Sequence, residues 1–474
     1  MSDTLHPRRN RAPAVRAAAP AAAARRVYVT LAVLLGGVSA ALAAEHNASG
    51  KSEAIFLAEL GILLLVSRGL GELMQKIGQP AVMGQLLGGL LLGPSVLGLI
   101  WPEFQHALFP RTAEQQSMIN AVSQLGILML LLLTGMETDL RLVRRVGKAA
   151  ITVAAAGVAF PFIFGFALGE MLPDSILPDP QARLVTALFL ATALSISSIK
   201  IVAMVVREMN FMRRDIGQII VASAIMEDSG GWIIIAVCFG LASSGAVDLR
   251  SVSFAILGTL LFLGASFTIG RRIVFRLIRW TNDHFDSEFA VITMILLIMI
   301  AMALTTYAIG AQTVLGAFVA GVLVGESPIL TRHIDEQLRG LIAALFMPVF
   351  FGLAGLGADL TILKDPGLLW LAGGLIVIAS VGKFSGAFVG GKLGGLSRPE
   401  SLALACAMNA RGSTEVIVAS IGLSAGVFSR DLFTLILAMA VVTTLAMPPM
   451  LRWALRRLPL REAERQRLAQ RQPA

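Results

Sequence analysis

Charged residues are scarce in this chain of 474 residues, because only 15% are Asp, Glu, Lys or Arg, whereas 56% are hydrophobic. An ordinary soluble domain carries about 25% charged residues. The 39 basic residues exceed the 30 acidic ones, but they stand in short clusters between long apolar runs. This pattern excludes a soluble enzyme, a nucleic-acid-binding protein and a disordered chain. It is typical of a multi-pass membrane protein.

Cysteine and histidine are also rare. The two cysteines, Cys238 and Cys406, lie in apolar runs, so no disulfide framework is expected. All five histidines fall outside the apolar segments, and no segment contains a HExxH or GxSxG pattern. We therefore expect that the chain is not an enzyme, and that it holds no cofactor and no resident metal.

The N-terminal region 1–44 has the features of a secretory signal. Six arginines precede an uncharged stretch at 27–44, which ends in a small-residue site, Ala-Leu-Ala-Ala. We expect cleavage there, and the alternative is an uncleaved anchor helix. Either interpretation places Glu45 outside the cell membrane.

Thirteen apolar segments follow, each about as long as a helix needs to be to cross ~30 Å of hydrocarbon. The shortest is the ninth, at 312–325. We expect transmembrane helices at 55–75, 80–100, 118–137, 149–169, 183–206, 216–241, 251–270, 289–308, 312–325, 340–358, 367–385, 400–421 and 432–451.

The basic residues give the orientation of these segments. With the start of the first segment outside, the cytoplasmic connections and tail hold 23 Lys or Arg, whereas the outer connections hold five. Cytoplasmic loops of membrane proteins carry such an excess. We therefore expect a bacterial inner-membrane type of protein with its mature N-terminus outside and a basic cytoplasmic tail at 452–474.

The segments also repeat weakly. The pattern GLLLG at 89–93 matches GVLVG at 321–325, and GMETDL at 135–140 matches GLGADL at 355–360. The matched segments run in opposite directions, which predicts six segments, one linker and six inverted segments (6+1+6). Inverted repeats are typical of secondary transporters, whose binding site lies at the midplane between the halves.

Several ionisable residues lie inside the segments, where they cost free energy unless they pair or line a cavity. Arg68 and Glu72 are one helical turn apart, which predicts a structural ion pair. Glu59 is expected to reach interfacial water. Lys200 could reach the cytoplasm or flank a cation path, and these alternatives stay open.

Glu227 and Asp228 lie near the middle of the sixth segment, where two adjacent carboxylates cannot form a solvated face. Adjacent helical positions point about 100° apart, so one side chain can face a cavity while the other meets a partner. We expect this pair to bind a proton or a metal cation. Lys383 is the natural cationic partner, although it lies near the inner end of its segment and could instead extend to the cytoplasm.

The twelfth segment carries MNARGSTE at 408–415, which no uninterrupted lipid-facing helix would contain. Such polar stretches are tolerated where broken helices line a cavity. The fifth segment holds its counterpart, TALSISS at 192–198, whose hydroxyl oxygens suit a hard monovalent cation. Both are the fifth segments of their halves, which predicts a pair of crossed, interrupted helices.

Together these residues resemble the monovalent cation:proton antiporter family, and its second branch with Kef-type systems most closely. The resemblance rests on TALS at 192–195, the acid pair, LGAFVAG at 315–321, FFGLAGL at 350–356 and MNARGSTE at 408–415, in the family's order. It implies a homodimer with a sodium/proton exchanger-like domain over 45–451. The dimerisation part would cover about 55–137 and 289–358, and the moving core part about 149–241 and 367–451.

The resemblance also implies roles for single residues. Asp228 would bind the ion with Glu227 beside it, Thr192 and Ser195 would supply oxygens, and Lys383 would be the charge partner. Asn409, Arg411 and Glu415 would form the broken-helix motif of the core. Two features depart from the family. The first acid is Glu rather than the usual Asp, Asn or Gln. Because only a short basic tail follows the last segment, we do not expect regulation by a Kef-type nucleotide-binding domain.

These expectations favour an antiporter that exchanges Na⁺ or K⁺ for H⁺ by alternating access, with proton and cation competing at Asp228. Its two adjacent acids favour electrogenic exchange. The alternatives are a gated cation channel on the same scaffold and a non-transporting sensor of pH or cations. Membrane lipid, the transported ions and a second copy of the chain are the expected partners, and nucleic acid is not.

Overall fold

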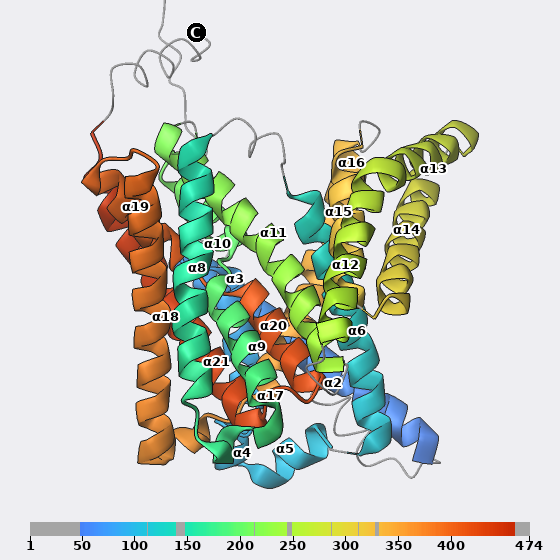
Figure 1. Cartoon of the computed structure of the whole chain (residues 1–474). Coiled ribbons are helices and arrows are strands. Elements are labelled where there is room, and N and C mark those ends of the chain that lie inside the picture. Colours follow the sequence, from blue (N-terminus) through green and yellow to red (C-terminus); the bar gives the residue numbers. More distant parts are fainter. Residues whose placement is uncertain are drawn as a thin grey trace, which may run out of the picture.

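The computed structural model describes residues 48–110, 112–138, 147–212, 214–243, 249–285, 287–310, 312–327 and 331–459. Every regular element in these residues is helical, as the sequence predicts, and the helices form one bundle (Figure 1). The expected signal peptide or anchor at 1–44 and the tail beyond residue 459 lie outside the described residues.

The first half of the bundle contains long helices, two short ones on a connection, and one interrupted pair. Its helices are α2 (Ala48–Lys76), α3 (Ala81–Leu92), α4 (Leu97–Ile100), α5 (Pro102–Leu108), α6 (Ala113–Met136), α8 (Lys148–Glu170), α9 (Arg183–Ser195), α10 (Ile199–Glu208) and α11 (Asp215–Ser243).

The second half begins with a helix that continues through a π-helical turn. Its elements are α12 (Leu249–Ala265), the π turn η3 (Ser266–Gly270), α13 (Arg271–His284), α14 (Glu288–Ala308), α15 (Thr313–Gly325), α16 (Arg332–Leu341), the π turn η4 (Ile342–Phe346), α17 (Met347–Gly357), α18 (Pro366–Leu393), α19 (Arg398–Met408), α20 (Ser413–Ser424) and α21 (Arg430–Arg456).

The bundle has the dimensions and the surface of a membrane protein. Within the described residues, ten helices are long and apolar enough to cross a membrane, and α15 and α20 are shorter apolar helices. Large apolar side chains such as Leu261, Leu297 and Trp370 are exposed on its sides. Because such a surface is stable only against lipid, the chain is a multi-pass membrane protein.

The helices pack as two groups. In one, α3 packs on α2 and α17, and α15 packs on α6 and α14. In the other, α8 packs on α18, α9 and α11, while α19 and α20 pack on α21. We refer to the end of the bundle where α21 ends, at the top of Figure 1, as the C-terminal end. The short helices α4 and α5 lie at the opposite end.

Glycine allows the closest helix contacts in the first group. A Cβ atom on Gly321 of α15 would lie 2.1 Å from the carbonyl oxygen of Leu132 on α6, and one on Gly135 would lie 2.2 Å from that of Phe318. Helices α3 and α17 meet in the same way, since a Cβ on Gly355 would lie 2.1 Å from the carbonyl oxygen of Leu86. Small residues let membrane helices approach closely, and dispersion attraction between the closely spaced backbones stabilises the packing.

Some expectations from the sequence differ from the structure. Helix α18 continues to Leu393, well beyond the expected end at 385, so Lys383 lies inside the helix and is buried. The expected connection at 271–288 contains α13. Glu59 is almost buried: the residue is 2% exposed, and its side chain accepts a hydrogen bond from Gln115. The expected ion pair between Arg68 and Glu72 is present.

The glycine contact between α6 and α15 predicts a difference between two alanine substitutions. Gly321→Ala should lower the stability by about 1–3 kcal/mol, because the new methyl group has no space. Gly373→Ala on α18 is the matched control, since nothing lies within 4 Å of its Cβ position. Thermal unfolding of both variants in detergent measures this, and equal midpoints would contradict the packing.

Candidate functional site

Two helices are interrupted near the middle of the second helix group. The chain leaves α9 at Ser195 and enters α10 at Ile199, with Ile196 extended between them. It leaves α19 at Met408 and enters α20 at Ser413. Each interruption coincides with a run of polar residues that the sequence predicts to be non-helical, because Ser, Thr and Asn side chains compete for backbone hydrogen bonds.

The two interruptions satisfy each other's backbone groups. The Ser198 backbone N–H donates to the Ala410 carbonyl oxygen at 2.8 Å, and the Ser197 hydroxyl donates to the Met408 carbonyl oxygen at 2.6 Å. The hydroxyls of Ser198 and Ser413 lie 3.4 Å apart. Free backbone groups are costly in hydrocarbon, so each broken helix depends on the other.

Asp228 lies on α11 at the start of α20 and is buried. The Thr414 hydroxyl, in the first turn of α20, donates to Asp228 Oδ1 at 2.9 Å. The positive end of a helix dipole stabilises a negative charge placed at its N-terminus. Thr414 belongs to the motif at 408–415, but sequence reasoning did not single it out. A hydroxyl in the first turn of a half-helix was the available signal.

Glu227 and Lys383 form a buried ion pair. Lys383 Nζ lies 2.7 Å from Glu227 Oε2 and donates to the carbonyl oxygens of Gly157, at 3.0 Å, and Ser195. Ser195 ends α9, so the ammonium group lies at the negative end of that helix dipole. A Cβ atom on Gly157 would lie 2.1 Å from Glu227 Oε1, so α8 needs glycine beside the pair. The sequence carried no signal for Gly157.

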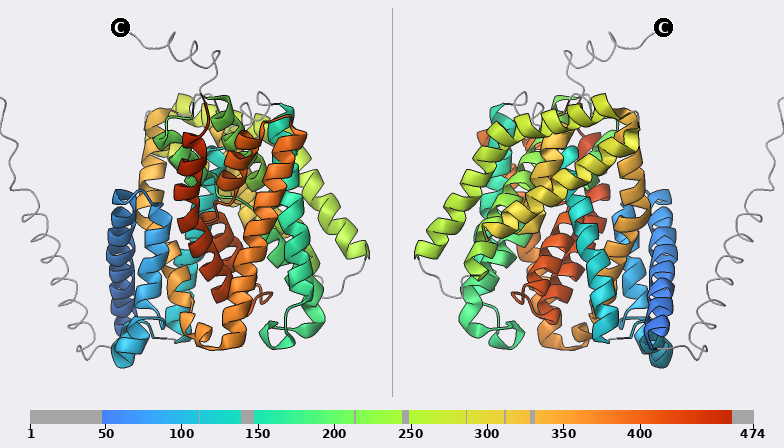
Figure 2. Two further views of the ribbon diagram at one scale, coloured as in Figure 1. Left: turned by 90° about the vertical axis from the view of Figure 1, so that its left-hand side faces the viewer. Right: turned by 90° about the vertical axis from the view of Figure 1, so that its right-hand side faces the viewer.

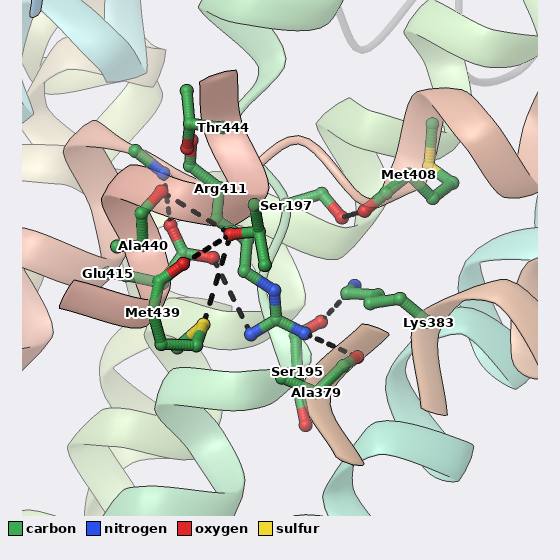
Figure 3. Close-up of polar contacts among 12 residues, drawn as sticks. Ser195, Ser197, Ala379, Lys383, Met408, Arg411, Glu415, Met439, Ala440 and Thr444 are labelled. Atoms are coloured by element: carbon green, nitrogen blue, oxygen red, sulfur yellow. Dashed lines mark hydrogen bonds and ion pairs between the residues drawn. The ribbon is translucent and has the colours of Figure 1, made fainter. Parts of the chain in front are cut away.

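Arg411 and Glu415 form a second pair of buried charges, shown in Figure 3. Arg411 Nη1 lies 4.0 Å from Glu415 Oε1, and Arg411 Nη2 donates to the Ala379 carbonyl oxygen at 2.9 Å. The other Glu415 oxygen accepts the Gly412 backbone N–H and thereby caps α20. Thr444 on α21 donates to the Arg411 carbonyl oxygen. These contacts connect the interruption to both α18 and α21.

The remaining candidate residues lie around these pairs. Asn409 is buried in the interruption between α19 and α20. The hydroxyls of Thr192 and Ser195 donate to carbonyl oxygens one turn earlier in α9, at 2.7 and 2.6 Å. Thr192 also contacts Cys238 on α11 at 3.6 Å, about 15 Å along that helix from Asp228. The structure therefore brings Ser195 to Lys383 and leaves Thr192 away from Asp228.

Glu137 connects the two helix groups near the C-terminal end. It pairs with Arg339 of its own group and with Lys200, on α10 of the other group, at 3.7 Å. Lys200 thus forms an ion pair that connects the second helix group to the first. A second connection is Arg452 on α21, whose guanidinium donates to the Gly78 carbonyl oxygen at 2.7 Å.

A cavity of about 450 Å³ lies between the two groups towards the opposite end. Residues of α2, α6 and α17 line one side, and residues of α20 and α21 line the other. Its polar lining includes Glu59, Asn120, Asp359, Ser420 and Arg430. The groups are thus connected by ion pairs near one end and separated by a polar cavity near the other.

Comparison with known proteins gives this arrangement a context. The chain is 27% identical over 399 residues to the Na(+)/H(+) antiporter NhaS4 of Synechocystis, covering 84% of this chain and 96% of that protein. It is 26% identical over 398 residues to the Na(+)/H(+)-K(+) antiporter GerN of Bacillus cereus, with the same two coverages. It is 29% identical over 397 residues to Cation/H(+) antiporter 15 of Arabidopsis thaliana, of which it spans 47%.

The fold is similar to a solved structure of the sodium proton antiporter MjNhaP1 from Methanocaldococcus jannaschii. The TM-score is 0.57 at 18% sequence identity, with 85% of this chain and 96% of that chain covered. A family model described as "Sodium/hydrogen exchanger, transmembrane" matches residues 61–457. Since this match spans most of the chain, the protein belongs to the transmembrane sodium/hydrogen exchanger family.

Proposed function

We propose that the protein is a secondary active antiporter that exchanges Na⁺ or K⁺ for H⁺, with proton and cation competing at Asp228. Family membership and the names of the relatives support the class of reaction. These names include the Na(+)/H(+) antiporter NhaS4 and the K(+)/H(+) antiporter 1 of Saccharomyces cerevisiae. The relatives differ in cation, so they do not select one.

The charge balance of the buried cluster carries the assignment of Asp228. With all five groups ionised, the cluster contains the carboxylates of Glu227, Asp228 and Glu415 but only two cations, Lys383 and Arg411. Glu227 and Glu415 each have a cationic partner, which leaves Asp228 with the hydrogen bond from Thr414. An uncompensated charge in hydrocarbon is costly. One proton or one monovalent cation at Asp228 neutralises the cluster, so the two ligands are alternatives.

Oxygens of the interrupted helices would complete a cation's shell. Ser195 lies beside the Glu227–Lys383 pair, and Asn409 Oδ1 makes no hydrogen bond within the described part of the chain. We propose that these two supply oxygen ligands close to Asp228. Thr192, on the same face of α9 as Ser195, would then belong to the path that leads to the site rather than to the shell in this conformation.

We propose that the second helix group is the moving core and the first the dimerisation part, as the resemblance implies. The contacts of Glu137 and Arg452 close the two groups against each other near the C-terminal end, whereas the cavity separates them near the opposite end. Opening one end while closing the other exposes Asp228 to one side at a time. Each ligand shifts this equilibrium only by its differential affinity for the two states.

The proposed topology has thirteen crossings in inverted halves. The two candidate repeats give equivalent contacts, because the second segment packs on the tenth (α3 on α17) as the ninth packs on the third (α15 on α6). The excess of Lys and Arg in the connections at the C-terminal end supports a cytoplasmic location of that end. We also propose a homodimer, as the family resemblance implies.

A gated channel and a sensor are the alternatives. A channel passes cations without a proton counter-current and without saturation at a carrier site, and a sensor gives no flux. Saturable proton flux driven by the cation separates an antiporter from both.

Asp228→Asn should abolish exchange, because a neutral amide cannot alternate between a proton and a cation. The assay uses proteoliposomes with an internal pH dye, to which Na⁺ or K⁺ is added after a proton gradient is set. Glu72→Gln is the matched control, since it removes an acid from an exposed pair on α2. Full cation-driven proton flux in Asp228→Asn would refute the assignment. A wild type without flux, shown to be folded, would favour the sensor.

The concentration of cation for half-maximal exchange should rise as the pH falls on the side where the cation binds. Because a proton and a cation exclude each other from one carboxylate, the rise approaches about tenfold for each pH unit where the empty site holds a proton. The maximal rate at saturating cation should change less. Initial rates over a matrix of pH and cation concentration test this, and an affinity independent of pH would exclude competition at one group.

Breaking the Glu227–Lys383 pair should destabilise the protein more than removing it entirely. Lys383→Met leaves Glu227 buried without its cation, and the loss of a partner in a buried pair costs about 3–5 kcal/mol. The double variant Glu227→Gln/Lys383→Met has neither charge and should unfold at a higher temperature than Lys383→Met alone. Additive losses in thermal unfolding would show that the two side chains do not interact.

A further inference from the structure

Helix α13 lies across the C-terminal end of the bundle. It continues α12 through the π turn η3 and runs almost perpendicular to the long helices (Figures 1 and 2). It packs on α14 and α15, and Arg271 at its start lies 3.2 Å from Glu326 at the end of α15. With four arginines in 14 residues, α13 is too polar to cross the membrane.

The side chains of α13 form stripes with helical spacing. Val274, Ile278 and Thr281 are buried against the bundle. Beside them, Ile273, Leu277 and Trp280 form an apolar stripe with exposures of 48%, 37% and 50%. Helical residues spaced by three or four lie on one face, so this stripe is continuous. It is separate from the buried face, and the packing of the fold does not explain it.

A basic stripe faces away from the bundle. Arg272, Arg276 and Arg279 are all exposed, and none forms an ion pair with another residue in the described part of the chain. Asp283 lies on the same stripe and reduces its formal charge to +2. An exposed apolar stripe beside a basic one is typical of a helix that lies in a membrane interface, with arginines at the level of the lipid headgroups.

The neighbouring surface identifies the partner. Exposed apolar residues also flank the stripe directly in the chain: Phe267 and Ile269 in η3 before α13, and Phe285 after it. The membrane surface is therefore expected to lie at this helix. An anionic lipid headgroup has the charge that complements Arg272, Arg276 and Arg279. We propose that α13 binds anionic phospholipid, with Arg272, Arg276 and Arg279 on the phosphates and Ile273, Leu277 and Trp280 on the acyl chains.

This binding would act at the connection between the two helix groups. Helix α12 packs on α11, which carries Glu227 and Asp228, whereas α13 packs on α14 of the first group. A bound lipid would hold the connection between α12 and α13 at the membrane interface.

The test compares lipid binding by two triple variants of the full chain in neutral detergent. Arg272→Gln/Arg276→Gln/Arg279→Gln removes the basic stripe. Lys148→Gln/Lys392→Gln/Arg398→Gln removes the same charge from exposed positions at the same end of the bundle. Phosphatidylglycerol is titrated against phosphatidylcholine, and bound lipid and the unfolding midpoint are measured. Each arginine near a headgroup strengthens binding about fivefold. The α13 variant should thus need at least tenfold more phosphatidylglycerol, and the control about as much as wild type.

Three outcomes would overturn the proposal. Equal losses in both triple variants would show that net charge alone attracts the lipid. A wild type without preference for phosphatidylglycerol would show that α13 binds no anionic lipid. An equal stabilisation by inorganic phosphate would show a general anion site. If the glutamine variant does not fold, Lys is substituted at the same three positions. The lysine variant should keep the preference for phosphatidylglycerol, because a point charge is sufficient to bind a headgroup. Loss of the preference in the lysine variant would contradict headgroup binding by α13.

Discussion

Two interrupted helices that complete each other's hydrogen bonds are the constraint on which the rest of the structure depends. A break in hydrocarbon is stable only if its free backbone groups find partners, and here each break supplies them to the other through Ser197, Ser198 and Ala410. The breaks also create helix ends with opposite dipoles. The Lys383 ammonium group lies at the C-terminal end of α9, and the Asp228 carboxylate lies at the N-terminal end of α20. The helix dipoles therefore stabilise the charges of both side chains.

The two helix groups share close glycine packing and differ in their buried polar contacts. Glycines bring α6 against α15 and α3 against α17 in the first group, where packing is close and apolar. Glycine also brings α18 against α8 in the second group, where a Cβ atom on Gly386 would lie 2.4 Å from the Ala156 carbonyl oxygen. This group in addition contains the buried charges and the breaks. Two close-packed groups that are connected by a few polar contacts are a suitable basis for movement between two states.

Much of the site could be predicted because charges inside apolar segments are rare enough to be informative. Glu227, Asp228, Lys383, Arg411 and Glu415 were all identified in this way, and the structure buries them together. The depth of Lys383 is underestimated because the expected segment ends at 385, whereas α18 continues to Leu393. Helix α13 is not predicted, because a cluster of arginines indicates a connection between transmembrane segments. Its buried, apolar and basic stripes become evident once the residues are known to be helical.

The membrane class, the polar interruptions and the identity of the buried charges can be predicted from the amino-acid sequence, because each depends on local composition. The tertiary structure decided the pairing. Glu227 and Lys383 are 156 residues apart, and nothing in either segment indicates that Glu227 pairs with the lysine while Asp228 accepts a hydrogen bond from Thr414. Adjacent positions on α11 face different neighbours, because Glu227 meets Lys383 of α18 whereas Asp228 meets Thr414 of α20. The tertiary packing thus determines which carboxylate keeps an ion partner.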